Sequence, residues 1–378
     1  MRIGIYTQPL WYNYGGLLQA WALQTVLKRM GHYVVTFNPN LYMHLSWKKK
    51  CFVYLKRLYR IITGKPGITS LRWEEKYNHE HDLKMQNLKP FIDNNINVKE
   101  YNDVKELSPL DYDVLIAGSD QVWRPKYNHT FGRTIENAFF EFAKDWNVKR
   151  IAYAASFGAD EWEFTKEQTI RCAQLAKKFQ AISVREMSGI SLCNKHLGVD
   201  ATLVLDPTLL LTRDDYELLL SKGKSTTKPI GDMLCYILDE SDDKSKLIKQ
   251  IAEERKMTPF RAQSKIYNQM AKIEEKIQPS VEQWIRNFID SKFVITDSFH
   301  ACVFSILFNK PFLVIGNNER GMARYKSLFS LLYLDNHLLI SINDYDKNDP
   351  YDIKDETYQA LKSIRDDSFS FIEKVLGI

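Results

Sequence analysis

The chain of 378 residues lacks the features that mark several large classes of protein. It has no run of 18 apolar residues, which argues against a membrane-spanning helix. Its opening stretch, MRIGIYTQPLWYNYGG, lacks the apolar centre of a signal peptide and is typical of a first strand. Five scattered cysteines form no CxxC pair, so we expect no disulfide framework and no zinc site, and we expect a reducing, cytoplasmic location.

Several catalytic signatures are also missing. The sequence contains no GxSxG motif, no HExxH motif and no Walker loop. No DxD motif follows a predicted strand, where it would hold a metal-bound nucleotide. A net charge of +5 is weak for this length and does not call for nucleic acid. We therefore predict neither a metal site nor a nucleic-acid partner.

What the chain does have is the composition of a globular α/β protein, 44% hydrophobic and 26% charged. Its length suits two domains, and short apolar strands alternate with helices throughout. This alternation predicts two doubly wound Rossmann-like domains that face a cleft. We place the first domain at 1–211 and the second at 212–345, with the boundary in the hydrophilic stretch 212–228. A C-terminal helix in 346–378 is a candidate to cross back to the first domain.

Ligands of doubly wound sheets bind outside the carboxyl ends of the strands. Polar clusters fall at five such positions, and we take these as the candidate site: 7–16, 117–124, 156–160, 185–188 and 297–300.

The first-domain clusters each have a functional and a structural interpretation. Gly15 and Gly16 precede a helix, where glycine lets the backbone approach an anion, although Asn13 in a plain turn would also explain them. Asp120 could accept hydrogen bonds from sugar hydroxyls and Trp123 could stack on a ring, or the segment could simply cap the next element. The candidate substrate-binding residues here are Asn13, Tyr14, Gly15, Gly16, Ser119, Asp120, Gln121 and Trp123.

Arg185 ends the predicted strand QAISVR. Burying an arginine is costly, so it is either paired or available to an anion. Glu186 is the obvious partner, but neighbouring residues of a strand point to opposite faces. This weakens the pairing and favours Arg185 as a fork for a carboxylate or a phosphate.

The second domain offers DSFH (297–300) between a strand and an apolar helix. Asp297 or Ser298 can cap that helix. His300 lies in its first turn, where the helix dipole disfavours the imidazolium, so the ring is suited to exchange a proton near neutral pH. A purely structural histidine is the alternative. Ser298 and two further arginines, Arg320 and Arg324, complete the candidate binding residues.

Residues 41–65, LYMHLSWKKKCFVYLKRLYRIITGK, carry seven Lys/Arg and no acidic residue. Trp47, Cys51, Leu55, Leu58 and Ile62 follow helical spacing. Such a basic amphipathic helix either packs its apolar stripe on its own domain or lies on an anionic membrane.

In combination, the clusters resemble the polysaccharide pyruvyl transferase family over residues 1 to about 335. The similar segments are YNYGGLLQAWALQTVLKRMGH (12–32), DVLIAGSDQVWRP (113–125), IAYAASFG (151–158), ISVRE (182–186), VLDPTLLL (204–211), VITDSFHACVFSILFNKPF (294–312) and ERGMARYKSLFSLL (319–332).

The resemblance implies a fold like that of the GT-B glycosyltransferases, with the acceptor on the first domain and the donor on the second. It also implies transfer of pyruvate from phosphoenolpyruvate, without a further cofactor, to paired hydroxyls of a sugar in polysaccharide biosynthesis, forming a cyclic ketal. By motif, the catalytic residues fall on His300 and Arg185. A lipid-linked sugar acceptor would give 41–65 a reason to touch the inner face of the membrane.

Two other functions remain open from the sequence: a nucleotide-sugar-dependent glycosyltransferase of the same fold, and a non-catalytic carbohydrate-binding relative. The ISVRE and DSFHA motifs favour pyruvyl transfer over the first. The presence of both Arg185 and His300 argues against the second. On this basis we expect Arg185→Ala and His300→Ala to abolish turnover and leave the fold intact.

Overall fold

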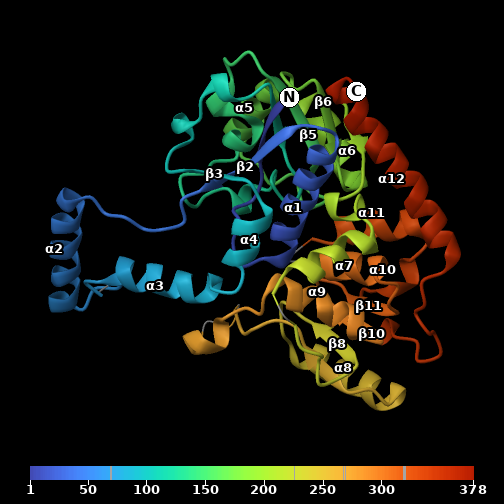
Figure 1. Ribbon diagram of the computed structural model, residues 1–378. Helices are drawn as coiled ribbons and strands as arrows, with labels where there is room; N and C mark the ends of the chain where they lie inside the picture. Colours follow the sequence, from blue (N-terminus) through green and yellow to red (C-terminus); the bar gives the residue numbers. More distant parts are fainter. Residues whose placement is uncertain (69, 225, 267, 269, 318–320) are drawn as a thin grey trace.

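Two parallel sheets organise the chain in the computed structural model, which describes residues 1–68, 70–224, 226–266, 268, 270–317 and 321–378 (Figure 1). Within these ranges, seven strands form the first sheet in the order β3-β2-β1-β4-β5-β6-β7, and five form the second in the order β12-β11-β10-β8-β9. The strand pairs of both sheets are parallel, for example Ile3 with Val114 and Val294 with Leu234. The predicted fold of two Rossmann-like domains is confirmed.

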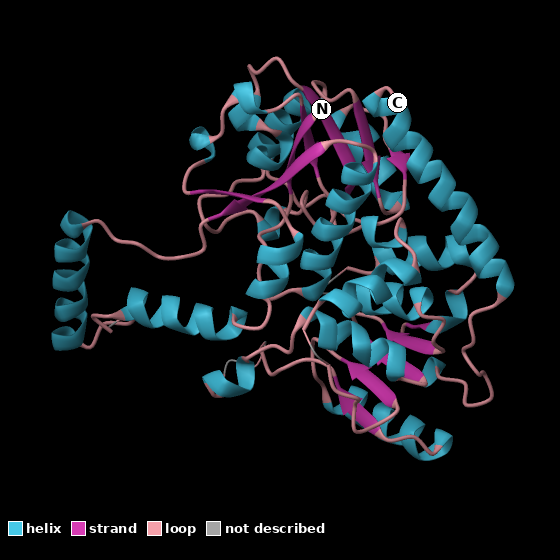
Figure 2. Ribbon diagram, in the orientation of Figure 1, coloured by secondary structure: helices cyan, strands magenta, loops and turns pink. Residues whose placement is uncertain are grey.

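The strands are short and lie between helices (Figure 2). In the first sheet they are β1 Arg2–Tyr6, β2 Tyr33–Pro39, β3 Val98–Tyr101, β4 Val114–Ala117, β5 Lys149–Ala155, β6 Ala181–Val184 and β7 Thr202–Leu203. In the second they are β8 Met233–Tyr236, β9 Pro259–Arg261, β10 Phe293–Thr296, β11 Phe312–Ile315 and β12 Leu338–Leu339.

The described residues form twelve α-helices, most of which cover the two faces of these sheets. They are α1 Tyr14–Arg29, α2 Trp47–Thr63, α3 Trp73–Met85, α4 Lys89–Asn95, α5 Lys166–Ala176, α6 Met187–Leu192, α7 Arg213–Lys222, α8 Asp242–Arg255, α9 Val281–Asp290, α10 Phe299–Leu307, α11 Ala323–Leu332 and α12 Asp355–Leu376. Because helices cover both faces, central strands such as β4 and β10 are buried at every position, which explains their continuous apolar sequences.

Some helices and strands do not show the apolar patterns from which secondary structure is predicted. The edge strand β3 has the sequence VKEY and buries only Tyr101 fully, so it shows no apolar run. The hydrophilic stretch 212–228, in which we place the domain boundary, contains helix α7. Thr212 and Asp215 form a capping box at its start, and Tyr216 and Leu219 are its buried side chains. The polar composition reflects an exposed outer face of this helix.

The two domains meet through buried aromatic side chains. Tyr14 of α1 stacks on Trp284 of α9 with ring centroids 5.2 Å apart, and its hydroxyl donates a hydrogen bond of 2.7 Å to the carbonyl of Pro279. On the other side of the junction, a Cβ on Gly321 would overlap the carbonyl oxygen of Gly158. The junction is therefore a packed interface that depends on backbone approach.

Helix α12 spans both domains along one side of the molecule (Figure 1). The hydroxyl of Tyr358 donates to the carbonyl of Ile306 in the second domain. Further along the helix, Arg365 donates to the carbonyl of Leu209, and the hydroxyl of Ser368 accepts the backbone N–H of Leu205, both in the first domain. The C-terminal helix thus bridges the two domains.

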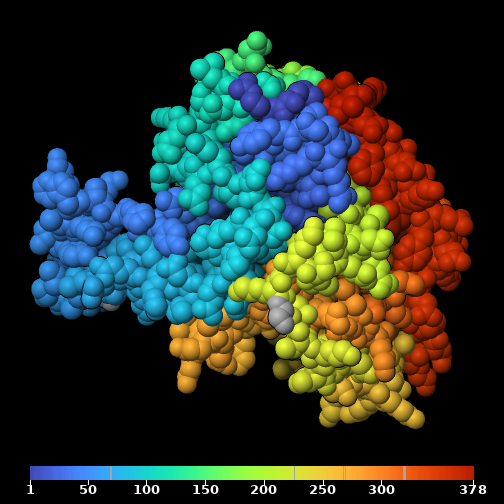
Figure 3. Space-filling view, in the orientation of Figure 1, coloured from blue at the N-terminus to red at the C-terminus, as the bar shows by residue number. Residues whose placement is uncertain are grey.

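Helices α2 and α3 form an arm that leaves the first domain, with α2 at its far end (Figures 1 and 3). The stripe of Trp47, Cys51, Leu55, Leu58 and Ile62 is exposed along α2. The interpretation that this helix packs its apolar stripe on its own domain is therefore wrong. No helix of the described residues is long and apolar enough to span a membrane.

We expect Ser368→Ala to lower the free energy of unfolding by about 1–3 kcal/mol, because the buried N–H of Leu205 loses its acceptor. Urea denaturation followed by circular dichroism measures this. Ser363 is exposed on the same helix, so Ser363→Ala is the matched control and should change stability by less than about 0.5 kcal/mol. Equal stability of the two variants would show that α12 does not hold the first domain.

Candidate active site

Both sheets reverse their strand order near the domain junction. In the first sheet the reversal lies between β1 and β4, and in the second between β8 and β10. Ligands of doubly wound sheets bind at such points, outside the carboxyl ends of the strands. The loops that follow these strands carry Asp120, which comes after β4, and the segment 297–300, which comes after β10. The candidate active site is therefore expected at the domain junction.

Arg185, directly after β6, is buried between two carboxylates. Its Nη2 lies 3.0 Å from Oδ1 of Asp120, and its Nη1 lies 2.5 Å from Oδ2 of Asp206. The guanidinium also sits 5.0 Å from the ring centre of Phe299, across the junction. Arg185 is thus held by the segments that follow β4 and β7 rather than by Glu186, and it is not the free fork that the sequence suggested. An Arg185→Ala variant would leave two buried carboxylates without their cation, so we no longer expect its fold to stay intact.

His300, in the first turn of α10, reaches into the same cluster from the second domain. Its Nε2 lies 3.6 Å from Oδ2 of Asp206, and it has no hydrogen-bond partner among the described residues. The other ring nitrogen faces α1, where a Cβ on Gly15 would overlap it. Gly15 is therefore required so that the histidine can fit against the first domain.

Asp206 joins the arginine to the histidine. Its Oδ2 also accepts a hydrogen bond of 3.0 Å from the hydroxyl of Ser119, and its Oδ1 accepts bonds from the backbone and hydroxyl of Thr208. Burial alone would raise the pKa of Asp206, but His300 and Arg185 outweigh it and hold that pKa well below its ordinary value. Asp206 is a fixed negative charge beside the histidine.

Glu186 behaves in the opposite way. Its Oε1 accepts the backbone N–H groups of Phe157 and Gly158, which fixes the loop after β5. Burial raises the pKa of Glu186 above its ordinary value, and Arg185 offsets this only in part. Arg324 of α11 is buried too, with its guanidinium 5.2 Å from the ring centre of Phe299. The cluster therefore combines three carboxylates and Arg185 of the first domain with His300 and Arg324 of the second.

The start of α10 differs from the predicted cap. Asp297 does not bond to its own helix; it accepts the backbone N–H groups of Leu238 and Asp239 and pairs with Lys244 at 2.7 Å. Ser298 occupies the cap position, but its side chain makes no capping hydrogen bond. The first-turn N–H groups of α10 are therefore not capped by either predicted residue, and such groups attract anions.

An open pocket of about 310 Å³ adjoins this cluster at the carboxyl ends of β1 and β4. Asp120 and Gln121 line it, as does Asn13, so it connects directly to the partner of Arg185. The volume lies within the usual range of small-molecule sites. The other lining residues are Gln8, Pro9, Trp11, Tyr12, Lys126, Tyr127, His129 and Thr130.

Two candidate binding residues are packing residues instead. Trp123 is fully buried, stacks on Phe139 at 4.5 Å and donates to the carbonyl of Ala138, so it offers no face to a sugar. Tyr14 is equally buried and packs in the domain junction.

The other candidates have different places. Asn13 caps α1 through the N–H of Gly15, which is the structural interpretation of that residue, and Gly16 lies inside the helix. Arg320 lies outside the described residues.

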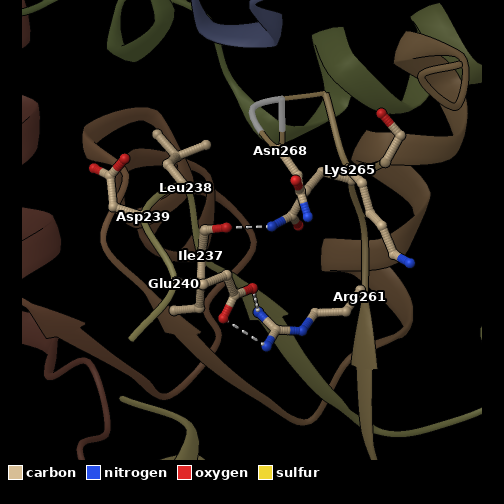
Figure 4. Close-up of a pocket in the computed structure, with 9 residues that line it drawn as sticks. Ile237, Leu238, Asp239, Glu240, Arg261, Lys265 and Asn268 are labelled. Atoms are coloured by element: carbon tan, nitrogen blue, oxygen red, sulfur yellow. Dashed lines mark hydrogen bonds and ion pairs between the residues drawn. The ribbon is translucent and has the colours of Figure 1, made fainter. Parts of the chain in front are cut away.

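A larger pocket of about 560 Å³ lies at the carboxyl ends of β8 and β9 (Figure 4). Several of its polar groups already have partners: Arg261 pairs with Glu240, and Gln263 donates to the carbonyl of Ile237. It takes residues from the second domain alone. We place the candidate active site at the junction, because ionisable side chains from both domains are buried together there. No cluster of three His, Cys, Asp or Glu side chains suited to a metal ion occurs in the described part of the chain.

Sequence reasoning missed Asp206 and the paired state of Arg185. The signal for Asp206 was present, since it directly follows the last predicted strand of the first domain in VLDPT. Phe299 was also missed as the ring that lies against both Arg185 and Arg324.

The family model described as polysaccharide pyruvyl transferase matches residues 13–319, which include the whole buried cluster except Arg324. The chain belongs to this family. No similar sequence was found among curated proteins.

Among solved structures, the chain is similar to a putative UDP-N-acetylglucosamine 2-epimerase from Listeria monocytogenes, with a TM-score of 0.50 and 11% identity over 99% of this chain and 96% of that one. It is also similar to Arabidopsis thaliana UGT89C1 in complex with UDP-L-rhamnose, with a TM-score of 0.46 and 10% identity over 97% and 94% of the two chains. At 11% identity the similarity to the epimerase concerns the fold alone, and that fold is the predicted GT-B-like one.

We expect Gly15→Ala to displace His300, because the new methyl group would occupy the space of its ring. The free energy of unfolding should fall by about 1–3 kcal/mol, as for an overpacked core, and the NMR signal of the His300 ring should shift. Gly16 is the matched control, since its Cβ would lie at an ordinary 3.7 Å from Asn13. Gly16→Ala should keep the His300 signal in place and be neutral or stabilising.

We expect Asp206→Asn to destabilise the protein at neutral pH by about 3 kcal/mol, because Arg185 stays buried with half its counter-charge. The folded-state pKa of Asp206 is lowered, so its charge stabilises the fold above the unfolded pKa and this contribution is lost as the pH falls through the folded value. The difference from the wild type should shrink below about pH 4. Urea midpoints measured across pH test this.

Glu186→Gln is the control for the same cluster. Burial raises the pKa of Glu186, so folding does not favour its charged form, and a glutamine that keeps the Oε1 acceptor should cost at most about 1 kcal/mol at neutral pH. If both variants lost the same stability at every pH, the opposite directions of the two pKa shifts would be contradicted.

Proposed function

We propose that the protein transfers pyruvate from phosphoenolpyruvate to two hydroxyls of one sugar residue, forming a cyclic ketal and releasing phosphate. The observation that carries this is the position of His300: an imidazole with an unbonded Nε2, beside a fixed carboxylate and two arginines, in a chain of the polysaccharide pyruvyl transferase family. Such an arrangement suits a small, doubly anionic donor that must be protonated to react.

The donor carries a carboxylate and a phosphate. Arg185 and Arg324 supply buried positive charge, and the uncapped start of α10 supplies backbone N–H groups close to His300. Because Arg185 is already anchored by Asp120 and Asp206, its charge is held in place before the donor arrives. Preorganised charges of this kind need little rearrangement during the reaction.

The reaction begins at the methylene carbon of phosphoenolpyruvate. His300, as the imidazolium, gives its proton to this carbon, and the central carbon becomes electrophilic. The first sugar hydroxyl then adds to the central carbon and gives up its proton to the histidine. The bond between the central carbon and the phosphate ester oxygen then breaks and releases phosphate. The second hydroxyl adds to the same carbon and closes the ketal, and the phosphate takes up its proton. Asp206 stabilises the charged form of His300 during this cycle.

The sugar acceptor fits the pocket of about 310 Å³ beside Asp120. Its lining offers Trp11 and Tyr12 as flat apolar faces, and Gln8 and Gln121 as amide groups for hydroxyls. Sugars are commonly bound by this combination of aromatic and polar side chains. Trp11, which lines the pocket, therefore takes the sugar-stacking role first suggested for the buried Trp123.

We expect His300→Gln to lower phosphate release from phosphoenolpyruvate by about 10²–10⁴-fold, as for the loss of a general acid–base group. Incubation with candidate lipid-linked sugars, followed by phosphate assay and mass spectrometry of the sugar, measures this. Glutamine keeps the side chain polar and of similar size, and the exposed His79 gives the matched control His79→Gln, which should keep full activity. Full activity of His300→Gln would overturn the assignment. A rise in the melting temperature with a nucleoside diphosphate, but not with phosphoenolpyruvate, would favour a nucleotide-sugar transferase.

A further inference from the structure

Helix α2 exposes its apolar side to solvent at the end of the arm. Trp47 is 73% exposed, Leu55 68% and Ile62 82%, and Phe52 and Tyr59 lie beside them on the same side of the helix. Soluble proteins rarely leave so many large apolar side chains together on one helix. This face therefore needs an occupant that the domain itself does not supply.

The opposite side of α2 is already occupied. Arg57, the buried residue of the helix, forms a two-pronged ion pair with Glu74 of α3, with distances of 2.5 and 2.8 Å, and also donates to the carbonyl of Leu71. This contact holds α2 against α3 by one side. The apolar stripe lies on the other side of the helix and is exposed, so the arm presents the stripe instead of folding it inward.

Charge decides between the possible occupants. Residues 41–65 contain seven Lys/Arg and no Asp or Glu. By helical spacing, Lys48 lies between Leu55 and Tyr59, at the edge of the stripe. Lys56, Lys49 and Arg60 follow Phe52 along one margin of the apolar face. A second copy of the helix would bring cations against cations, with no acid in the segment to compensate. An anionic lipid surface matches both the apolar stripe and the basic flanks.

We propose that α2 is an interfacial helix that docks the protein on an anionic membrane. It lies in the plane of the headgroups, with Trp47, Leu55 and Ile62 inserted below them and Lys49 and Lys56 at the level of the lipid phosphates. Aromatic side chains such as Trp47, Phe52 and Tyr59 prefer this boundary region. Each basic residue near such a surface contributes about five-fold to affinity, and each inserted large apolar side chain about ten-fold or more. This proposal does not rest on the proposed function.

The test is co-sedimentation of the full chain with lipid vesicles, in the absence of donor and acceptor. We expect binding to vesicles of equal phosphatidylglycerol and phosphatidylcholine, weak binding to phosphatidylcholine alone, and loss of binding as salt is raised. The Leu55→Ser/Ile62→Ser variant should bind at least about 100-fold more weakly, from two inserted side chains. Lys49→Glu/Lys56→Glu should weaken binding to the anionic vesicles by about 25-fold or more.

The changed side chains are exposed, so these variants should fold as the wild type does, which circular dichroism can verify. Ile230→Ser and Lys249→Glu alter exposed residues of the second domain and are the matched controls, with unchanged binding expected. Absence of wild-type binding, or equal binding by the α2 variants, would overturn the proposal. Analytical ultracentrifugation gives a further outcome. If the wild type were a dimer, the Leu55→Ser/Ile62→Ser variant a monomer, and neither bound vesicles, the stripe would be covered by a second copy. Activity on a water-soluble acceptor should be the same in all these variants, which separates this test from that of the proposed function.

Discussion

The buried ion pairs of Arg185 are the constraint around which the site is arranged. A guanidinium this deeply buried is tolerated only with counter-charges and hydrogen bonds, and Asp120 and Asp206 supply them from the ends of β4 and β7. Breaking either ion pair would leave an uncompensated charge in the protein interior. The carboxyl ends of three strands are therefore tied together, and Asp206 is fixed where it can face His300 from the other domain.

Glycine makes the approach of the two domains possible. His300 fits against α1 because residue 15 has no side chain, and the loop before α11 fits against Gly158 because residue 321 has none. Gly321 also has a φ of +90°, which other residues rarely adopt. The histidine is thus positioned by backbone contact as well as by charge. A site of this kind tolerates little added volume at the junction, whereas Gly16, one residue along, has room for a methyl group.

Much of the fold could be predicted from the sequence, because buried parallel strands such as β4 and β11 are short apolar runs between turns. Edge strand β3 could not, since its polar sequence reflects exposure on the sheet edge. For the site, strand-end position correctly brought Arg185, Asp120 and His300 together. It could not tell which side chains turn inward: Trp123 points into the core, although its neighbour Gln121 lines the pocket.

The sequence also could not predict which side chains pair with one another in the folded protein. The pairing of Arg185 with Asp206 joins residues 21 positions apart, and its pairing with Asp120 joins residues 65 apart, so neither follows from local spacing. The opposite holds for α2, whose amphipathic pattern is local and was visible from the sequence. What the sequence left open was whether the apolar stripe is covered, since that depends on the direction in which the arm leaves the domain.

The arm and the pocket are physically connected. Trp11 lines the pocket next to Asp120 and also lies 6.1 Å, between ring centres, from His81 of α3. Tyr42, at the entry to the arm, packs on the same histidine and donates a hydrogen bond to Asp82. His81 is therefore a common contact of the pocket wall and of the segment that enters the arm. Helix α3 carries both His81, which lies against the pocket wall, and Glu74, which holds α2, so the proposed acceptor pocket and the proposed membrane helix are linked through one helix.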